Sequence, residues 1–385
     1  MINIAIDGNH HFHKTFGVFA GYGNMDPGKV LKEKSEQAAF IRKVATDLCS
    51  SLKMLPQGGR IVFTADSRSW RKDVEIENGG YKSGRVKDEV VDWTIFFELM
   101  TSFGEQLEKM GFIFSRVEGA EGDDLLMFWS DYFNLNGENC LIISGDYDMH
   151  QLARKNDKAW TAVWNTNSKK NMLSVHQKWE ELWLNKNESV GMSIFNMSSA
   201  ISPEKDKFKE FLKKVKIEEI DSYSFIFHKV LIGDDGDSVP SVWDYMVKNK
   251  DGEDKIVRFT DSKAKKVYAA LTETEWIDIP FDLLIKNEEF LNWISGLILR
   301  TTKDVDTKDN RRKVALNFER NLILMWLNYK VIPPFVIKGA SQEISRGMEI
   351  QKKNVTLDRI KILEGSEWVT TGYQPKGFDP FSYLQ

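Results

Sequence analysis

The stretch that decides the fold is LIISGDYDMHQL, residues 141–152, in which an apolar run ends at a glycine and two aspartates follow. Continuous apolar runs of this kind are typical of strands that are covered on both faces of a parallel sheet. Asp146 and Asp148 would then lie just beyond a strand end. Aspartate forms turns and caps helices, so local punctuation is one explanation, and a bound cation is the other. The residues at the other strand ends must decide between them.

Similar apolar runs recur along the first third of the chain and alternate with segments of helical spacing. Strands are predicted at residues 2–6, 60–65, 112–117, 140–144 and 159–164. Helices are predicted at residues 35–55, 93–110 and 121–133, with a short helix at 149–155. This alternation favours right-handed crossovers and an α/β fold with a central, mainly parallel sheet flanked by helices.

The rest of the chain departs from this alternation. Residues 67–92 are polar, strongly charged and aperiodic, and a long insertion of this kind is either functional or disordered. A charged helix is predicted in PEKDKFKEFLKKVK, residues 203–216, within a second polar insertion. We therefore divide the chain into an α/β core at 1–164, an insertion at 165–220, a mostly helical region at 221–338 and a C-terminal extension at 339–385.

Composition bounds the class of protein. With 42% hydrophobic and 12% aromatic residues, the 385-residue chain has ample material for a packed core and is not of the disordered type. Cys49 and Cys140 lie in apolar segments and are expected to be buried, with no disulfide or zinc-type spacing. The N-terminal MINIAID is too short for a secretory signal, and no apolar run reaches membrane-spanning length. We expect a cytoplasmic monomer with no membrane partner.

Acidic residues follow three of the predicted strands. Asp7 ends the first strand, Asp66 follows the second, and Asp146 and Asp148 follow the fourth. Because the carboxyl ends of parallel strands emerge along one edge of a sheet, these side chains are expected to lie at one rim. A further acidic group, Glu121, Asp123 and Asp124, begins the helix that follows the third strand.

Capping accounts for these acids one by one but not for their gathering at one edge. Two carboxylates that lie 4 Å apart repel each other by roughly 4 kcal/mol at an effective dielectric constant near 20. A compensating cation relieves that repulsion. The oxygen-only donors favour magnesium or manganese. His10, His11 and His13 follow Asp7 too irregularly to form a ligand set.

Five motifs in order carry a resemblance: IDG at Asp7, FTADS with WRKD, EGDDLL, ISGDYDMHQL, and IGDDGDSVPSV at 232–242. In this order they resemble the structure-specific 5′ nucleases, a family that includes flap endonucleases, the 5′ nuclease domains of bacterial polymerases and the phage-type RNase H. The match covers about residues 1–155 and 223–250, and FERNLILMWL at 318–327 resembles a late helix of the phage branch. The resemblance implies a PIN/resolvase-like nuclease core.

The resemblance also implies roles for the acids. It suggests a first metal group of Asp7, Asp66, Glu121 and Asp123, with Asp146 between the sites, and a second group of Asp148, Asp234 and Asp237. Asp124 lies beside these clusters, and Asp235 has no counterpart. Two Mg²⁺ ions are implied, for which Mn²⁺ can substitute.

Nucleic-acid contacts are implied as well. Residues 67–92 resemble the helical arch through which a single-stranded 5′ end passes, with Arg71 and Lys82 on the scissile phosphate and Arg85 as a third contact. The segment at 223–250 resembles a helix–three-turn–helix that grips duplex phosphates, with a K⁺ ion for which Ser238 and Ser241 would supply oxygens. Pro240 replaces the usual second glycine there, and residues 165–220 have no counterpart in the family.

The expected function is a metal-dependent 5′→3′ exonuclease and 5′-flap endonuclease that acts on branched or nicked DNA and on RNA–DNA hybrids and removes RNA primers during replication. Without the nine carboxylates assigned to the site, the net charge of −4 becomes positive, and a positive charge on the rest of the chain suits binding to nucleic acid. Two alternatives are a magnesium-dependent phosphatase and a non-catalytic junction-binding protein. The tail GFDPFSYLQ, residues 377–385, could dock on a sliding clamp or a single-strand-binding protein or pack on its own domain. For a phage-encoded chain, the compartment would be the host cytoplasm.

Overall fold

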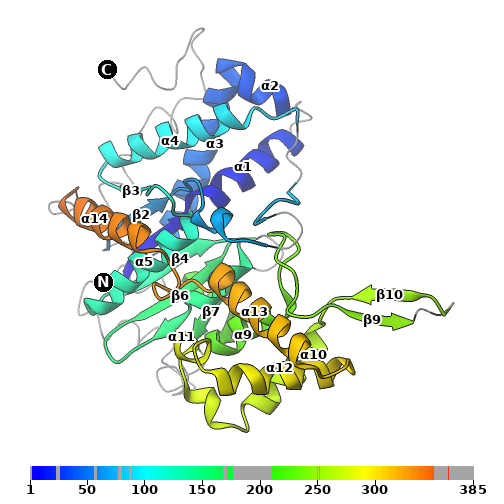
Figure 1. Cartoon of the computed structure of the whole chain (residues 1–385). Coiled ribbons are helices and arrows are strands. Elements are labelled where there is room, and N and C mark those ends of the chain that lie inside the picture. Colours follow the sequence, from blue (N-terminus) through cyan, green and yellow to red (C-terminus); the bar gives the residue numbers. More distant parts are fainter. Residues whose placement is uncertain are drawn as a thin grey trace. The chain divides into compact units, whose positions relative to one another are not determined.

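The computed structural model describes residues 2–22, 27–55, 59–76, 80–85, 89–167, 171–176, 210–248, 250, 252–350 and 363. The chain divides into two compact units (Figure 1). The first consists of residues 1–68, 87–220 and 334–385, and the second of residues 69–86 and 221–333. In the described ranges, no helix is long and apolar enough to cross a membrane. The C-terminal tail at 377–385 lies outside the described residues.

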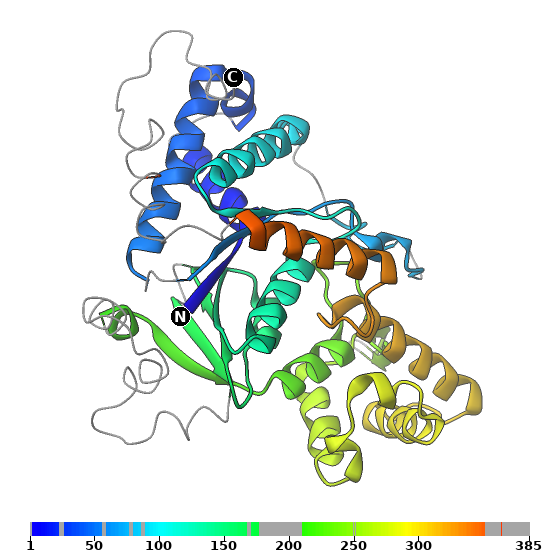
Figure 2. The same ribbon diagram turned by 90° about the vertical axis from the view of Figure 1, so that its left-hand side faces the viewer.

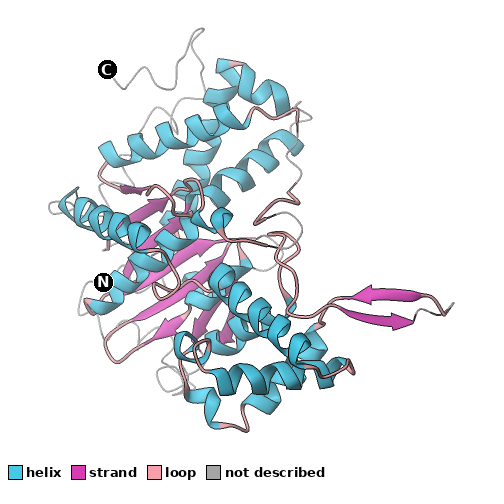
Figure 3. Ribbon diagram, viewed as in Figure 1, coloured by secondary structure: helices cyan, strands magenta, loops and turns pink. Residues whose placement is uncertain are grey.

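The first unit is built on one sheet with strand order β3-β2-β1-β4-β6-β7-β8 (Figure 3). Its parallel part contains β1 (Ile2–Asp7), β2 (Ile61–Thr64), β3 (Ile113–Ser115), β4 (Asn139–Ser144) and β6 (Trp160–Asn165). These are the five predicted strands, and each neighbouring pair among them is parallel, which confirms the predicted mainly parallel sheet.

The polar insertion at 165–220 adds strands that the sequence did not predict. It contains β7 (Met172–His176), antiparallel to β6, and β8 (Lys216–Ile220), parallel to β7. The two-residue strand β5 (Arg154–Lys155) pairs with β6. Of the charged helix predicted at 203–216, the described residues 210–214 are helical. The insertion therefore extends the sheet.

Helices cover both faces of this sheet (Figures 1 and 2). On one face lie α1 (Gly8–Tyr22), α2 (Pro27–Lys32), α3 (Lys34–Lys53) and α4 (Trp93–Lys109). On the other lie α5 (Gly122–Leu135) and α14 (Pro334–Ile350). Alternation along β3 separates the faces: Phe112 and Phe114 join the cluster with α4, whereas Ser115 Oγ accepts a hydrogen bond from Trp129 of α5 at 2.9 Å.

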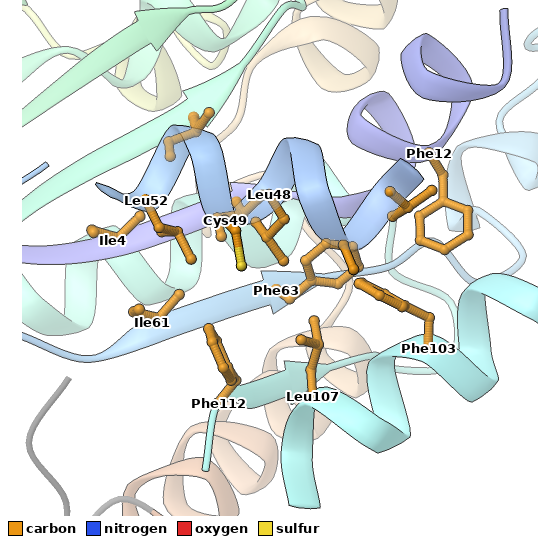
Figure 4. Packing of buried hydrophobic residues seen from close by; sticks show 14 of the residues in the cluster. Ile4, Phe12, Leu48, Cys49, Leu52, Ile61, Phe63, Phe103, Leu107 and Phe112 are labelled. Atoms are coloured by element: carbon orange, nitrogen blue, oxygen red, sulfur yellow. The ribbon is translucent and has the colours of Figure 1, made fainter. Parts of the chain in front are cut away.

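The aromatic core of the first unit lies between the sheet and α1, α3 and α4 (Figure 4). Phe12 is fully buried, and the centre of its ring lies 5.4 Å from that of Phe103 and 6.4 Å from that of Phe63. Gly104 allows α4 to approach the sheet closely, because a Cβ there would lie 2.2 Å from the Phe114 ring. Phe12 and Phe16 are four residues apart on the buried face of α1, a helix that the sequence analysis missed.

The second unit is mostly helical, as predicted for the later part of the chain. It contains η1 (Trp70–Asp73), α9 (Ser222–Ile232), α10 (Asp261–Leu271), η4 (Glu275–Asp278), α11 (Phe281–Leu284), α12 (Glu288–Thr302) and α13 (Lys308–Met325). Phe227, Phe290 and Phe318 are fully buried at the centre of its core. Its residues 69–86 come from the insertion that the sequence analysis placed in the α/β core.

Three local expectations need correction. Within 67–92, the residues described (all except 77–79 and 86–88) form the short 3-10 helix η1 and a turn at 81–84 rather than longer arch helices. After α9 the chain enters the hairpin of β9 (Tyr245–Lys248) and β10 (Asp254–Val257), so the helix that follows the acidic turn begins only at Asp261. The strand-forming residues of YMVK favour that hairpin. The helix α14 crosses the expected boundary at 338 and groups with the first unit.

The aromatic core gives a direct test of this packing. Phe103→Ala removes a ring in contact with Phe12 and Phe63, and we expect the free energy of unfolding to fall by about 3–5 kcal/mol in urea denaturation. Leu135→Ala serves as the control, since Leu135 is 79% exposed and its truncation should change the free energy by less than about 0.5 kcal/mol. Equal effects of the two substitutions would contradict the packing.

Candidate metal centre

Strand register brings the first acidic group to one edge of the sheet. Asp7, the last residue of β1, is opposite Thr64, the last residue of β2, and Ile6 is opposite Ile143 of β4. Asp66 follows Thr64 by two residues, and Asp146 follows Ser144 by two residues, so both carboxylates leave the sheet at the edge where Asp7 ends.

Asp7 is held by two hydrogen bonds. Its Oδ1 accepts from the backbone N–H of His10 at 2.8 Å, which satisfies a donor in the first turn of α1. Its Oδ2 accepts from the Ser144 hydroxyl at 2.7 Å. Asp7 is only 5% exposed. Its carboxylate is therefore fixed between two adjacent strand ends.

Asp66 and the acidic start of α5 are linked in the same way. Asp66 Oδ1 accepts from the backbone N–H of Gly122 at 2.6 Å, and the Asp66 N–H donates to Asn9 Oδ1 at 2.9 Å. Glu121 and Asp124 form a capping box in which Asp124 Oδ2 accepts from the Glu121 N–H at 3.1 Å. Capping, which the sequence left as an alternative, thus describes Glu121 and Asp124 correctly.

The stretch with which the sequence analysis began turns at the same edge. After β4, the Asp146 N–H donates to Ser144 Oγ at 3.0 Å, and Asp146 Oδ1 accepts from the Asp148 N–H at 2.8 Å. Asp146 thereby caps the 3-10 helix η2 (Tyr147–Leu152), which replaces the predicted α-helix at 149–155. Gly145 is required here, because a Cβ would lie 2.1 Å from the His10 ring.

Local hydrogen bonds do not remove the repulsion between these carboxylates. Burial raises the pKa of Asp123 well above its ordinary value, and the charges of Asp7, Asp146, Glu121 and Asp66 raise it further. Burial also raises the pKa of Asp7, to which Asp146 adds, although His10 and the hydrogen bond from Ser144 oppose the change. Asp123 is thus the residue on which the charges of the others converge.

This donor set suits a hard divalent cation. The converging groups are carboxylate oxygens, which Mg²⁺ and Mn²⁺ prefer, and a cation among them would relieve the repulsion that raises the pKa of Asp123. In the ranges that the structure describes, no three acidic, histidine or cysteine side chains are positioned as a complete metal-binding group. The residues that fit the ion best are therefore those that act on Asp123, namely Asp7, Asp66, Glu121 and Asp146.

Three supporting residues were missed by the sequence analysis. Ser144 joins Asp7 to the turn of Asp146, Asn9 holds the backbone at Asp66, and the His10 backbone binds Asp7. Each is within three residues of an acid or aligned with one across the sheet, so strand register was the signal that could have found them.

The second acidic group lies in the second unit, where it already has partners. Asp234 Oδ2 forms an ion pair with Lys229 Nζ at 2.9 Å. Burial raises the pKa of Asp234, but Lys229 and backbone hydrogen bonds lower it by more, so that it lies below its ordinary value. Asp237 accepts hydrogen bonds from the Tyr81 hydroxyl at 2.8 Å and from the Arg85 guanidinium at 2.5 Å. Asp235 pairs with Arg258. Metal binding by Asp234, Asp237 and, in the first unit, Asp148 stays a prediction.

The predicted phosphate contacts also lie in the second unit. The turn at 80–85 binds the acidic turn, since the Lys82 N–H donates to the Asp237 carbonyl at 2.8 Å and the Gly84 N–H to Ser238 Oγ at 2.8 Å. Lys82 is half-buried with a left-handed backbone at φ 60°, and Arg85 is exposed. These two side chains are displayed together on one pair of joined turns.

Two other predicted contacts are used inside the second unit. Arg71 is 1% exposed, and its Nε donates to the Leu324 carbonyl at 2.8 Å. Ser241 is 2% exposed, donates to Asp244 at 2.7 Å and accepts from the Phe259 N–H at 3.2 Å. In this structure neither side chain reaches solvent, so their nucleic-acid and K⁺ roles stay predictions that require a rearrangement.

Residues 3–182 match the family described as the 5'-3' exonuclease, N-terminal resolvase-like domain. Among solved structures, the bacteriophage T5 D15 flap endonuclease in complex with DNA and metal ions is 14% identical, with a TM-score of 0.48 over 92% of this chain and 100% of that one. The T5 5′-exonuclease with bound zinc is 16% identical, with a TM-score of 0.47 over 91% and 100% of the two chains. No curated protein matches the chain.

Removal of the negative charge of Asp123 should stabilise the metal-free protein. Because the Asp123 pKa is higher in the folded state than its ordinary value of 3.8, the folded state holds the proton more tightly and stability falls as pH rises above 3.8 toward the folded pKa. Asp123→Asn should therefore raise the unfolding midpoint at pH 7.5 in chelator, and the gain over wild type should shrink toward acid pH.

The exposed Asp157→Asn is the matched control for this measurement, since its loss of one negative charge should leave the midpoint almost unchanged. Saturating Mg²⁺ should raise the wild-type midpoint more than that of Asp123→Asn. A variant that is less stable than wild type in chelator at pH 7.5 would show that burial of the Asp123 charge among other acids does not destabilise the metal-free fold.

The Ser144 hydroxyl gives a second test of the centre. Ser144→Ala leaves Asp7 Oδ2 without its donor and the Asp146 N–H without its acceptor. We expect Mn²⁺ affinity, measured by calorimetry, to fall by about 10–100-fold, as is typical when a group that orients metal ligands is removed. Unchanged affinity would place the metal away from Asp7 and Asp146. Ser130→Ala, a change of a buried serine on α5 that bonds Met127 and Arg154, is a control outside the acidic edge.

Proposed function

We propose that this chain, whose residues 3–182 match the 5'-3' exonuclease, N-terminal resolvase-like domain, is a divalent-metal-dependent nuclease that hydrolyses phosphodiesters at 5′ ends and 5′ flaps. The observation that carries the proposal is the strand register that brings Asp7, Asp66 and Asp146 to one edge of the sheet, where their charges and that of Glu121 act on Asp123. Four separate segments supply these acids. Carboxylates that repel one another at one place indicate a site that binds a cation.

Phosphodiester hydrolysis needs an activated water and neutralisation of the charge that builds on the phosphoryl and leaving oxygens. Two divalent ions, when bound, supply both. In this chain Asp7, Asp66, Glu121, Asp123 and Asp146 would hold them. The role of Ser144 and of the His10 N–H is to fix both oxygens of Asp7, so that the carboxylate does not have to reorganise during the reaction.

The capping roles of Glu121, Asp124 and Asp146 are compatible with metal binding. A carboxylate has about four acceptor positions, so an oxygen that accepts one N–H bond keeps capacity for a cation or its water. The backbone bonds then serve to orient these acids. The acids that bind the metal would then be held in place by the first turns of α5 and η2.

Substrate binding is assigned to the second unit. Lys82 and Arg85 lie on the turn at 80–85, whose N–H groups bind the Asp237 carbonyl and Ser238 Oγ of the acidic turn. Both cations are suited to the phosphates of a nucleic-acid strand. Arg85 already pairs with Asp237, so a phosphate would compete with that carboxylate. We propose DNA and RNA–DNA hybrids with a free 5′ end or flap as substrates, and primer removal as the task.

A flap-cleavage assay tests the proposal. The wild-type protein with Mg²⁺ should cut a 5′-labelled flap and an RNA–DNA hybrid, and chelator should abolish both reactions. Asp146→Asn combined with Asp148→Asn should reduce the rate by on the order of 10²–10³-fold, because the charge that stabilises the transition state is lost. Asp309→Asn, an exposed change in the second unit, is the charge control.

The same assay separates the alternatives. Flap binding without Mg²⁺-dependent cutting would identify a non-catalytic junction-binding protein. Turnover of a small phosphate ester without cleavage of nucleic acid would identify a phosphatase. Full cleavage by the double variant would remove the acidic edge from the mechanism.

A further inference from the structure

A cavity of about 290 Å³ lies in the first unit between α1 and α3. Asp7 lines it from the end of β1, His10, His11 and Lys14 from the start of α1, and Asp47, Leu48, Ser50 and Ser51 from α3. Ile6, Thr15, Ile143 and Thr166 complete the wall. Its volume is at the lower end of the range of small-molecule pockets.

The cavity shares one wall with the candidate metal centre. That wall is Asp7, flanked by the last apolar residues of two adjacent strands, Ile6 and Ile143. The acids at the start of α5 come from the opposite face of the sheet, which α5 covers. A group bound at Asp7 therefore has the acidic edge on one side and this cavity on the other.

The lining combines apolar walls with neutral polar groups. Ile6, Leu48 and Ile143 are apolar, and Thr15, Ser50 and Ser51 carry hydroxyls. The Nε2 atom of His10 is buried against Gly145, so it does not face the cavity. The Ser50 and Ser51 hydroxyls donate to the carbonyls of Thr46 and Asp47 within α3 and keep lone pairs that can accept a hydrogen bond from a ligand.

The charges in the wall disfavour an anion. Asp7 and Asp47 would repel one, and the positive Lys14 already donates from Nζ to the Thr166 carbonyl at 2.6 Å. A neutral, flat, heteroaromatic group with hydrogen-bonding edges suits these walls better, since it can contact aliphatic side chains while its edge reaches the hydroxyls.

We propose that this cavity binds the base of a nucleoside 5′-monophosphate whose phosphate lies at the metal centre beside Asp7. The inference rests on the proposed function and adds to it a site for the nucleotide released from, or held at, the cleaved end. The base contributes affinity through the α1–α3 cavity, and its hydrogen-bonding edge meets the hydroxyls of Thr15, Ser50 and Ser51.

Calorimetry on the Mg²⁺-loaded full chain tests this site with three probes: 2′-deoxyadenosine 5′-monophosphate, deoxyribose 5-phosphate and inorganic phosphate. We expect the nucleotide to bind at least about tenfold more tightly than deoxyribose 5-phosphate. Ser51→Trp, which places an indole in the cavity, should abolish that preference. Lys53→Trp, an exposed change on α3 outside the cavity wall, should retain it.

The outcomes keep this inference distinct from the proposed function. If the wild-type protein cleaves flaps but binds the nucleotide and deoxyribose 5-phosphate equally, the cavity proposal is overturned and the nuclease is not. A preference that survives in Ser51→Trp also overturns it. If Ser51→Trp does not fold, as judged by its unfolding transition, Ser50→Trp at the exposed end of the wall replaces it, with the same expected loss of preference.

Discussion

Mutual repulsion among carboxylates is the constraint on which the first unit depends. A parallel sheet places every strand end of one direction at the same edge, and here those ends carry Asp7, Asp66 and Asp146. The pKa of Asp123 rises well above its ordinary value, first because burial removes the hydration of its carboxylate and then because the charges of Asp7, Asp146, Glu121 and Asp66 repel it. The chain meets part of this cost with N–H and hydroxyl donors. Those donors orient the carboxylates and leave their charge in place.

The two acidic groups show how context separates similar motifs. In the first unit the carboxylates act on one another, whereas in the second unit Asp234, Asp235 and Asp237 each meet a cation: Lys229, Arg258 and Arg85. In the sequence both groups are short acidic stretches beside a glycine. Only the fold reveals that the acids of the second group pair with cations of their own unit, whereas those of the first raise the pKa of one another. Burial of Arg71 and Ser241 is a second case, since nothing in their local sequence marks them as interior residues.

The parallel sheet was predictable because each strand is a continuous apolar run, and register then followed from the rule that parallel strand ends share an edge. The helix α1 was not predictable, because three histidines in GNHHFHKTF obscure the helical spacing of its buried residues, Phe12 and Phe16. The strands β7 and β8 escaped prediction because β8, with Lys216, Glu218 and Glu219, is a polar edge strand. The supporting role of Ser144 could not be found locally, since its partner Asp7 is 137 positions away.

The contact between Gly145 and the His10 ring has a mechanical consequence. No side chain fits between them, so the turn that carries Asp146 rests directly on the first turn of α1, which also holds Asp7. A larger side chain at position 145 would have to displace the His10 ring, and with it the helical turn whose N–H binds Asp7. Acids from strands that are remote in sequence are thus coupled sterically, through the packing of one glycine against one imidazole ring.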